Sequence, residues 1–203
     1  MKTPLSYQVS EYDCGPTTLL NAVNFLFDRK QIYPDLIKYI QSYCMDGFDN
    51  CGEIGKGGTS RMAMKFLASW LNQYRCVRKL PIYCESLKSE EVFLEPESRI
   101  VRCLSNGGCA VTRVDLCGGH YVLLTGVDDG RVCLFDPYYR DKPFRIEGVE
   151  MVESEPFRMN RKVRFDVVNS ESRRYYALGR PDQRECVLLY NTRACIKCEN
   201  RPM

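Results

Sequence analysis

Apolar residues in the first part of the chain recur at helical spacing. From about Pro16 to Asp28 the chain is apolar around most of a helical circumference, and the polar residues Asn21, Asn24 and Asp28 fall on one narrow stripe. This pattern predicts a buried central helix. Pro16 suits the first turn of that helix, where its missing N–H costs no hydrogen bond.

Three further helices are expected before the middle of the chain. They run from Pro34 to about Tyr43, onward from a cap at Thr59 or Ser60, and from about Glu97 to Ser105. The third of the four predicted helices carries an apolar stripe at intervals of three and four: Ala63, Phe66, Leu67, Trp70, Leu71 and Tyr74. The glycine-rich stretch Gly52–Gly58 is expected to be a loop.

Beyond Gly108 the apolar spacing becomes that of strands. Strands are predicted at Ala110–Val114, His120–Val127, Arg131–Phe135, Val163–Val168 and Cys186–Tyr190. Helices precede strands, which favours an α+β fold with an antiparallel sheet over alternating βαβ units. No repeat or linker divides the 203 residues, so one domain is expected over 1–203. Its core is expected at about 7–165, with 166–203 as an extension that completes the sheet.

Composition favours a soluble globular protein of the cytoplasm. Hydrophobic residues make up 44% and charged residues 27%. No apolar run of about 18 residues is present, and the first residues lack a secretory signal, so no membrane span and no export are expected. The net charge is +3. From Arg158 onward 11 Lys/Arg stand against 5 Asp/Glu, which is interpreted as a solvated basic surface, with no nucleic-acid partner.

The chain contains 12 cysteines and one histidine. Without an export signal, the cysteines are expected to be reduced thiols that behave mostly as small buried hydrophobes. A single histidine cannot support a multi-histidine metal site. No metal and no cofactor are therefore expected.

Cys14 is the candidate nucleophile because it immediately precedes the predicted buried helix, in the run Tyr12-Asp13-Cys14-Gly15-Pro16. Unpaired N–H groups and the helix dipole at such a position favour the thiolate, which is the reactive form. Gly15 is expected to leave room for the backbone of a substrate.

His120 is the candidate base, and Asp136 lies across a predicted hairpin from it. If the loop is Asp128-Asp129-Gly130, His120 is opposite Tyr138, and Asp136 lies two residues away on the same face, within diagonal reach. A two-residue Asp129-Gly130 turn puts the two side chains on opposite faces unless a bulge intervenes. The carboxylate would fix one ring nitrogen and leave the other to accept a thiol proton.

These residues resemble the motifs of a known family. Gln8, Cys14-Gly15, Gly119-His120-Tyr121-Val122 and Asp136-Pro137 are similar, in order and spacing, to motifs of the C39 peptidases. These papain-like cysteine proteases are best known as leader-cleaving domains of bacteriocin exporters. The resemblance spans about Tyr7 to Tyr138 and implies a papain-like fold, in which a central buried helix packs on an antiparallel sheet.

The resemblance also implies a role for each matched residue. Cys14 would be the nucleophile, His120 the general base and then acid, and Asp136 the orienting residue. Gln8 would donate its side-chain amide to the oxyanion, together with the backbone N–H of Cys14. Exporter-borne members carry a membrane domain and an ATPase, whereas this chain is expected to be a free-standing member.

The predicted function is that of a cysteine peptidase or amide hydrolase that acts on a peptide or protein substrate through a thioester. Three alternatives remain open. The same cysteine could serve a transpeptidase or acyltransferase. The chain could be a non-catalytic binding protein of the same fold. Cys195-x2-Cys198, joined by Cys44 and Cys51, could hold structural zinc. The sequence does not determine the oligomeric state.

Overall fold

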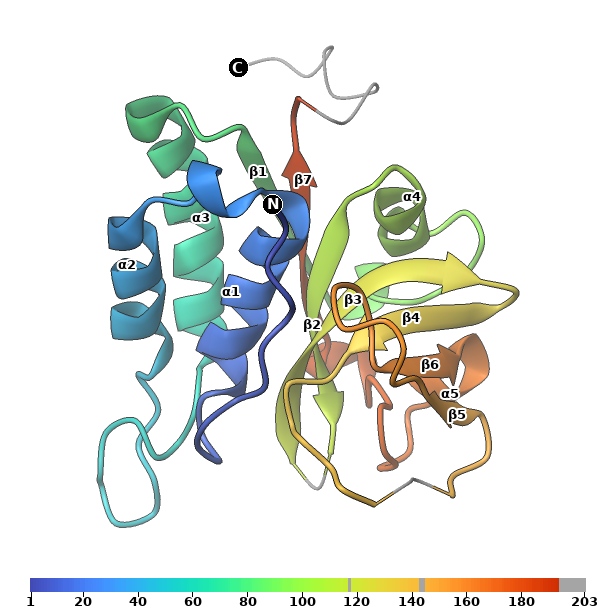
Figure 1. Cartoon of the computed structure of the whole chain (residues 1–203). Helices are drawn as coiled ribbons and strands as arrows, with labels where there is room; N and C mark the ends of the chain where they lie inside the picture. Colours follow the sequence, from blue (N-terminus) through green and yellow to red (C-terminus); the bar gives the residue numbers. More distant parts are fainter. Residues whose placement is uncertain (117, 143–144, 194–203) are drawn as a thin grey trace.

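The computed structural model describes residues 1–116, 118–142 and 145–193 (Figure 1). Its strands form one sheet in the order β1-β7-β2-β3-β4-β6-β5, and each neighbouring pair is antiparallel. The strands are β1 (Ile82–Lys88), β2 (Cys109–Asp115), β3 (Gly119–Asp128), β4 (Arg131–Phe135), β5 (Val149–Met151), β6 (Arg161–Arg164) and β7 (Glu185–Asn191).

Helices cover the sheet on both sides. The helices are α1 (Cys14–Leu26), α2 (Pro34–Cys44), α3 (Arg61–Arg78), α4 (Arg99–Ser105) and α5 (Phe165–Asn169), with short 3-10 turns at Arg29–Gln31, Ser89–Glu91 and Pro181–Gln183. Figure 1 shows α1, α2 and α3 together on one side, while α4 and α5 lie beside the other half of the sheet. The expected α+β fold, with a central buried helix on an antiparallel sheet, is confirmed.

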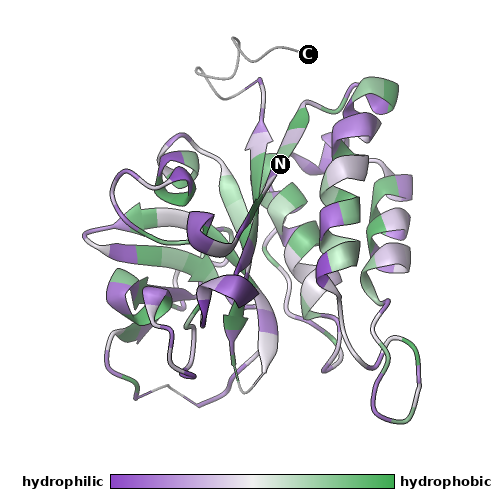
Figure 2. Ribbon diagram, turned by 180° about the vertical axis from the view of Figure 1, so that it is seen from behind, coloured by the Kyte–Doolittle hydropathy of each residue, from purple (hydrophilic) through white to green (hydrophobic). Residues whose placement is uncertain are grey.

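Alternate residues of the central strands enter two separate hydrophobic cores. In β3, Tyr121 and Leu123 pack under α1 to α3, whereas Val122 and Leu124 pack with α4 and α5. Because both faces are covered, the strand is almost continuously apolar instead of alternating with polar residues. Figure 2 shows this as green ribbon along the central strands. Each fully buried aliphatic side chain stabilises the fold by roughly 1.5–3 kcal/mol.

Buried hydrogen bonds fix α1 against its neighbours. The Thr18 hydroxyl donates to the carbonyl of Tyr121 in β3 at 3.0 Å. Asn21, from the polar stripe, exchanges two 2.8 Å hydrogen bonds with the backbone of Ser6. The stripe therefore anchors the N-terminal segment at this point, while Thr18 aligns the start of α1 with the start of β3.

The C-terminal part of the fold differs from the sequence prediction. The strand expected at Val163–Val168 ends at Arg164, and Val167 and Val168 are buried in α5. The strands β1 and β5 were not predicted. The strand β7, in the predicted C-terminal extension, lies between β1 and β2 inside the sheet.

Candidate active site

Cys14 is the first residue of α1 and is 8% exposed. Burial acts to raise the pKa of its thiol, but a hydrogen bond with His120 and the charge of the imidazole act in the opposite direction. Backbone hydrogen bonds from Tyr121 and Gly15 add to this effect. The pKa of Cys14 is consequently held below its ordinary value, which favours the thiolate.

His120 lies at the start of β3, and its Nε2 is 2.8 Å from Oδ1 of Asp136. This contact leaves Nδ1 as the ring nitrogen that can face Cys14. Burial acts to lower the pKa of His120, but the hydrogen bonds and charges of Asp136 and Cys14 outweigh burial and raise it to about 9. The two pKa shifts together favour a thiolate–imidazolium pair.

Asp136 follows β4 directly and is fully buried. Its Oδ1 also accepts from the backbone N–H of Tyr138 at 2.8 Å, and its Oδ2 accepts from the hydroxyl of Tyr176 at 2.7 Å. Burial acts to raise the pKa of Asp136, but His120, Tyr176 and the N–H of Tyr138 outweigh it and lower the pKa. The carboxylate is thus ionised and has a partner on each oxygen.

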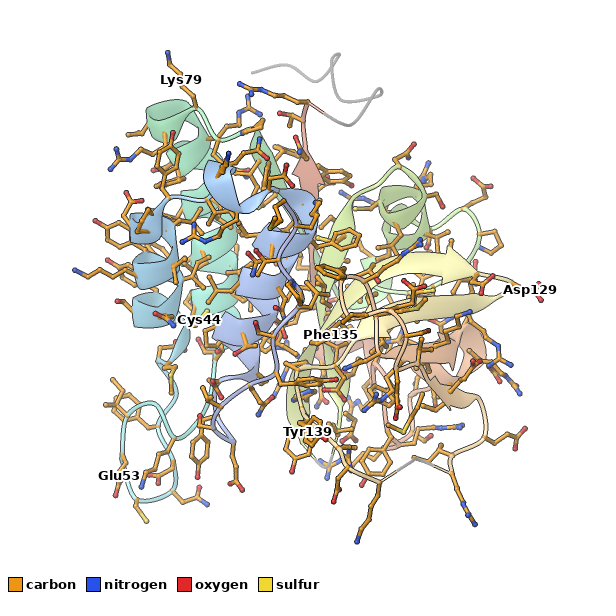
Figure 3. The ribbon with its side chains drawn as sticks, viewed as in Figure 1. Cys44, Glu53, Lys79, Asp129, Phe135 and Tyr139 are labelled. Atoms are coloured by element: carbon orange, nitrogen blue, oxygen red, sulfur yellow. The ribbon has the colours of Figure 1, made fainter. Side chains whose placement is uncertain are left out.

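The hairpin of β3 and β4 brings His120 and Asp136 together through a bulge. Asp128 pairs with Arg131, so the turn has two residues, Asp129 and Gly130, with φ of 43° and 70°. Both angles are left-handed, as in a type I′ turn. The three-residue loop is therefore wrong. A bulge at Thr125, between Leu124 and Gly126, shifts the pairing register by one residue. His120 and Asp136 therefore lie on the same face of the hairpin, as they would with a three-residue loop. Figure 3 shows Asp129 at the far tip of the hairpin, away from Tyr139.

Gln8 lies beside the carboxylate segment. Its backbone N–H donates to the carbonyl of Pro137 at 2.8 Å, and the neighbouring ring of Tyr7 contacts Phe135 and Tyr139. The side-chain Nε2 of Gln8 donates to the carbonyl of Ser10 at 2.7 Å. Among the described residues no hydrogen bond joins Gln8 to Cys14, and the second hydrogen of Nε2 remains for another acceptor.

Solved structures similar to this chain are peptidase domains of transporters. A double-glycine-motif protease from an AMS/PCAT transporter, in complex with the leader peptide, has a TM-score of 0.46 and 13% identity over 94% of this chain and 93% of its own. The peptidase domain of Streptococcus ComA, a bifunctional ABC transporter involved in quorum sensing, has a TM-score of 0.40 and 19% identity over 66% and 79%. That of Streptococcus mutans ComA has a TM-score of 0.33 and 16% identity over 67% and 79%.

The similarity is to solved peptidase domains, at 13–19% identity. No family model matches the chain, and no curated protein matches it in sequence.

Two supports of Asp136 come from beyond the part of the chain that carries the C39-like motifs. Asn160 accepts from the N–H of Asp136 and donates to its carbonyl, both at 2.8 Å. Tyr176 is fully buried with φ of 67°, a conformation that costs a bulky residue on the order of 1–3 kcal/mol. Neither residue is indicated as a site residue by the sequence, because both contacts are tertiary and neither segment carries a motif.

Thr59 occupies the space next to Gly15. A side chain at Gly15 would collide with the Thr59 side chain, so the room that Gly15 leaves is already filled from the loop that precedes α3. The expectation that a substrate backbone fits against Gly15 is therefore wrong. Gly15 instead allows this loop to close over the first turn of α1.

The nine described cysteines are free thiols. No group of three or more potential metal ligands occurs among the described residues. Cys195 and Cys198, the pair considered for structural zinc, lie outside the described residues. No helix within the described ranges is long and apolar enough to cross a membrane.

Proposed function

We propose that the protein is a cysteine peptidase or amide hydrolase that acts on a peptide through Cys14, His120 and Asp136. The observation that carries the proposal is the geometry around His120: its Nε2 lies 2.8 Å from the carboxylate of the fully buried Asp136, and it lowers the pKa of the Cys14 thiol at the start of α1. A nucleophile, a base and an orienting group in this order are the requirements of acyl transfer.

In the proposed reaction the Cys14 thiolate attacks the substrate carbonyl carbon and forms a C–S bond. The carbonyl electrons move to oxygen, and the backbone N–H of Cys14 at the helix start and the Nε2 of Gln8 donate to that oxyanion. Preorganised donors of this kind each contribute roughly 3–4 kcal/mol to the stability of the transition state. The C–N bond then breaks while His120 gives its proton to the leaving amine.

Water resolves the resulting thioester. His120, now neutral, takes a proton from water as the oxygen attacks the carbonyl carbon. The C–S bond breaks, the acid leaves, and the thiolate–imidazolium pair is restored. Asp136 holds the ring orientation and stabilises the imidazolium throughout, and it keeps its own negative charge.

The protein is proposed to act in a reducing compartment, as the cytoplasm is. Its nucleophile must be a free thiolate, and the described cysteines are free. An oxidising compartment would expose Cys14 and the exposed thiols of Cys51 and Cys76 to oxidation.

Selective alkylation tests the thiol. Iodoacetamide at pH 6, followed by mass spectrometry, should label Cys14 faster than the exposed thiols of Cys51 and Cys76, although Cys14 is the more buried. The substitution His120→Ala should remove this advantage. Equal or slower labelling of Cys14 in the wild-type protein would contradict the proposal.

Isotope incorporation tests the acceptor. A mixture of peptides from a digested proteome is incubated with the protein in water enriched in oxygen-18. Hydrolysis should create new carboxyl termini that carry the heavy isotope, and the Cys14→Ala protein should create none. New amide bonds without isotope incorporation would instead assign the protein as a transpeptidase.

A further inference from the structure

An open cavity of about 870 Å³ lies next to His120, the general base of the proposed active site. Gly118 and Gly119, directly before His120, form part of its wall. Four arginines line it: Arg113 from β2, and Arg173, Arg174 and Arg180 from the segment that follows α5. The C-terminal excess of basic residues is therefore partly gathered at one hollow instead of being spread evenly over the surface.

The arginines of this cavity exceed its acidic groups. Asp115 and Glu171 are the acidic residues of the lining. Arg180 pairs with Asp182 at 3.1 Å outside the lining. Arg173 and Arg174 are exposed and form no ion pair among the described residues. Two exposed guanidinium groups in the lining thus remain available.

Arg113 brings a further positive charge close to His120. Its guanidinium packs directly on Gly119, where any side chain would collide with it. Glu185, whose charge interacts with Arg113, already accepts from the hydroxyl of Tyr121 at 2.9 Å and lies 3.7 Å from Arg61. One carboxylate is therefore shared by two arginines, and Gly119 is a glycine because the guanidinium needs its space.

We propose that this cavity binds the carboxylates of an acidic segment of the peptide substrate, beside the bond that Cys14 attacks. The proposal rests on the proposed function. Guanidinium groups match carboxylates with paired, planar hydrogen bonds. The volume is in the range of pockets that bind drug-sized ligands. A recessed hollow suits a single extended peptide better than the broad contact of a nucleic-acid duplex.

Binding to the full-length Cys14→Ala protein tests the cavity without chemistry. The probe is rhodamine-labelled hexaglutamate with an amidated C-terminus, measured by fluorescence anisotropy, with labelled hexaglutamine amide as the uncharged comparison. Arg173→Gln/Arg174→Gln should weaken hexaglutamate binding roughly tenfold. The control Arg75→Gln/Arg102→Gln, on α3 and α4, removes the same charge elsewhere and should leave binding unchanged.

Equal weakening by the two double variants would overturn the proposal, because binding would then follow net charge alone. Tighter binding of a labelled thymidine oligonucleotide that displaces hexaglutamate would also overturn it, in favour of nucleic acid. Hexaglutamine with a free C-terminus identifies the source of the carboxylate. If it displaces labelled hexaglutamate, the cavity binds the carboxylate of a chain terminus. If it does not, the cavity binds the carboxylates of acidic side chains.

The two proposals fail separately. Hexaglutamate binding that depends on Arg173 and Arg174, together with an unreactive Cys14 in the wild-type protein, would remove the hydrolase and keep the acidic-peptide site. A reactive Cys14 without such binding would keep the hydrolase and remove the acidic-peptide site.

Discussion

The hydroxyl of Tyr176 lies 2.7 Å from Oδ2 of Asp136, on the opposite side of the carboxylate from His120. Tyr176 belongs to the core under α4 and α5, whereas Cys14 belongs to the core under α1 to α3. The proposed catalytic residues therefore connect the two layers of the molecule. A buried carboxylate is tolerated only when its charge and hydrogen-bonding capacity are satisfied, and Tyr176 supplies one of the required donors.

Removal of this hydroxyl should weaken catalysis. The substitution Tyr176→Phe keeps the ring but leaves Oδ2 without its donor, so the pKa of Asp136 should rise and the imidazole should be held less firmly. The free energy of unfolding should fall by about 1.5–3 kcal/mol. We expect kcat to fall roughly tenfold with little change in KM, as measured by steady-state peptide hydrolysis.

Tyr74→Phe is the matched control for that experiment. The Tyr74 hydroxyl also donates to an aspartate, Asp35, at 2.8 Å, but it does so between α3 and α2. This variant should lose stability and keep kcat. Equal kcat in Tyr176→Phe and the wild-type protein would show that Tyr176 has only a structural role.

The single histidine makes a direct titration possible. In untagged protein, proton NMR should show one imidazole that titrates with a pKa of about 9. Cys14→Ala and Asp136→Asn should each lower this pKa, because each removes a partner that stabilises the imidazolium. An unchanged pKa in both variants would show that neither residue contacts the ring in solution.

The rate of hydrolysis should follow the ionisation of the same pair. Above pH about 9 the imidazolium loses its proton, so the leaving amine lacks its acid and kcat should fall. On the acid side the rate should fall as the Cys14 thiolate becomes protonated, at a pH below the ordinary thiol range because its pKa is lowered. In Asp136→Asn the alkaline limb should move toward neutrality. A limb that does not move would contradict the role of Asp136.

Cys14 and His120 should act as one unit. Cys14→Ala should reduce kcat/KM roughly a thousandfold or more, and His120→Ala should cost nearly as much. The double variant should be no worse than Cys14→Ala alone, because either change removes the same reacting pair. Additive losses in the double variant would mean that the two residues act independently. Circular dichroism should confirm that each variant remains folded.

Gln8 should contribute through the transition state. Gln8→Ala should lower kcat roughly a hundredfold to a thousandfold with KM nearly unchanged, the effect of losing one oxyanion donor. The His120 titration should stay the same in this variant. Gln31→Ala, in the 3-10 turn after α1, serves as a surface control. A change in KM alone would assign Gln8 to substrate binding instead.

Local patterns predicted the parts of the site that depend on neighbours in sequence. The apolar run after Cys14 identified α1, and the continuous apolar stretch after His120 identified β3, because each pattern reports burial of one segment. Cys14 and His120 could be proposed as partners from those positions. Their contact depends on Thr18 and Tyr121, which join α1 to β3 across 103 residues of sequence.

The bulge at Thr125 sets the facing of His120 relative to Asp136, and Gly126 beside it is a local signal, because a glycine within a strand often marks a bulge. The other supports depend on tertiary relationships. Tyr176 has a left-handed backbone and reaches Asp136 from 40 residues further along the chain. The valines of α5 suit a strand by propensity, but burial against the second core overrides that preference.

The position of β7 has a consequence for synthesis on the ribosome. Because β7 pairs with both β1 and β2, the sheet contains a vacancy until residues 185–191 have been translated. Earlier chain lengths expose two unpaired strand edges, which invite intermolecular association, and they hold the nucleophile in an incomplete scaffold. The sheet is accordingly complete only once β7 has entered between two strands that were made long before it.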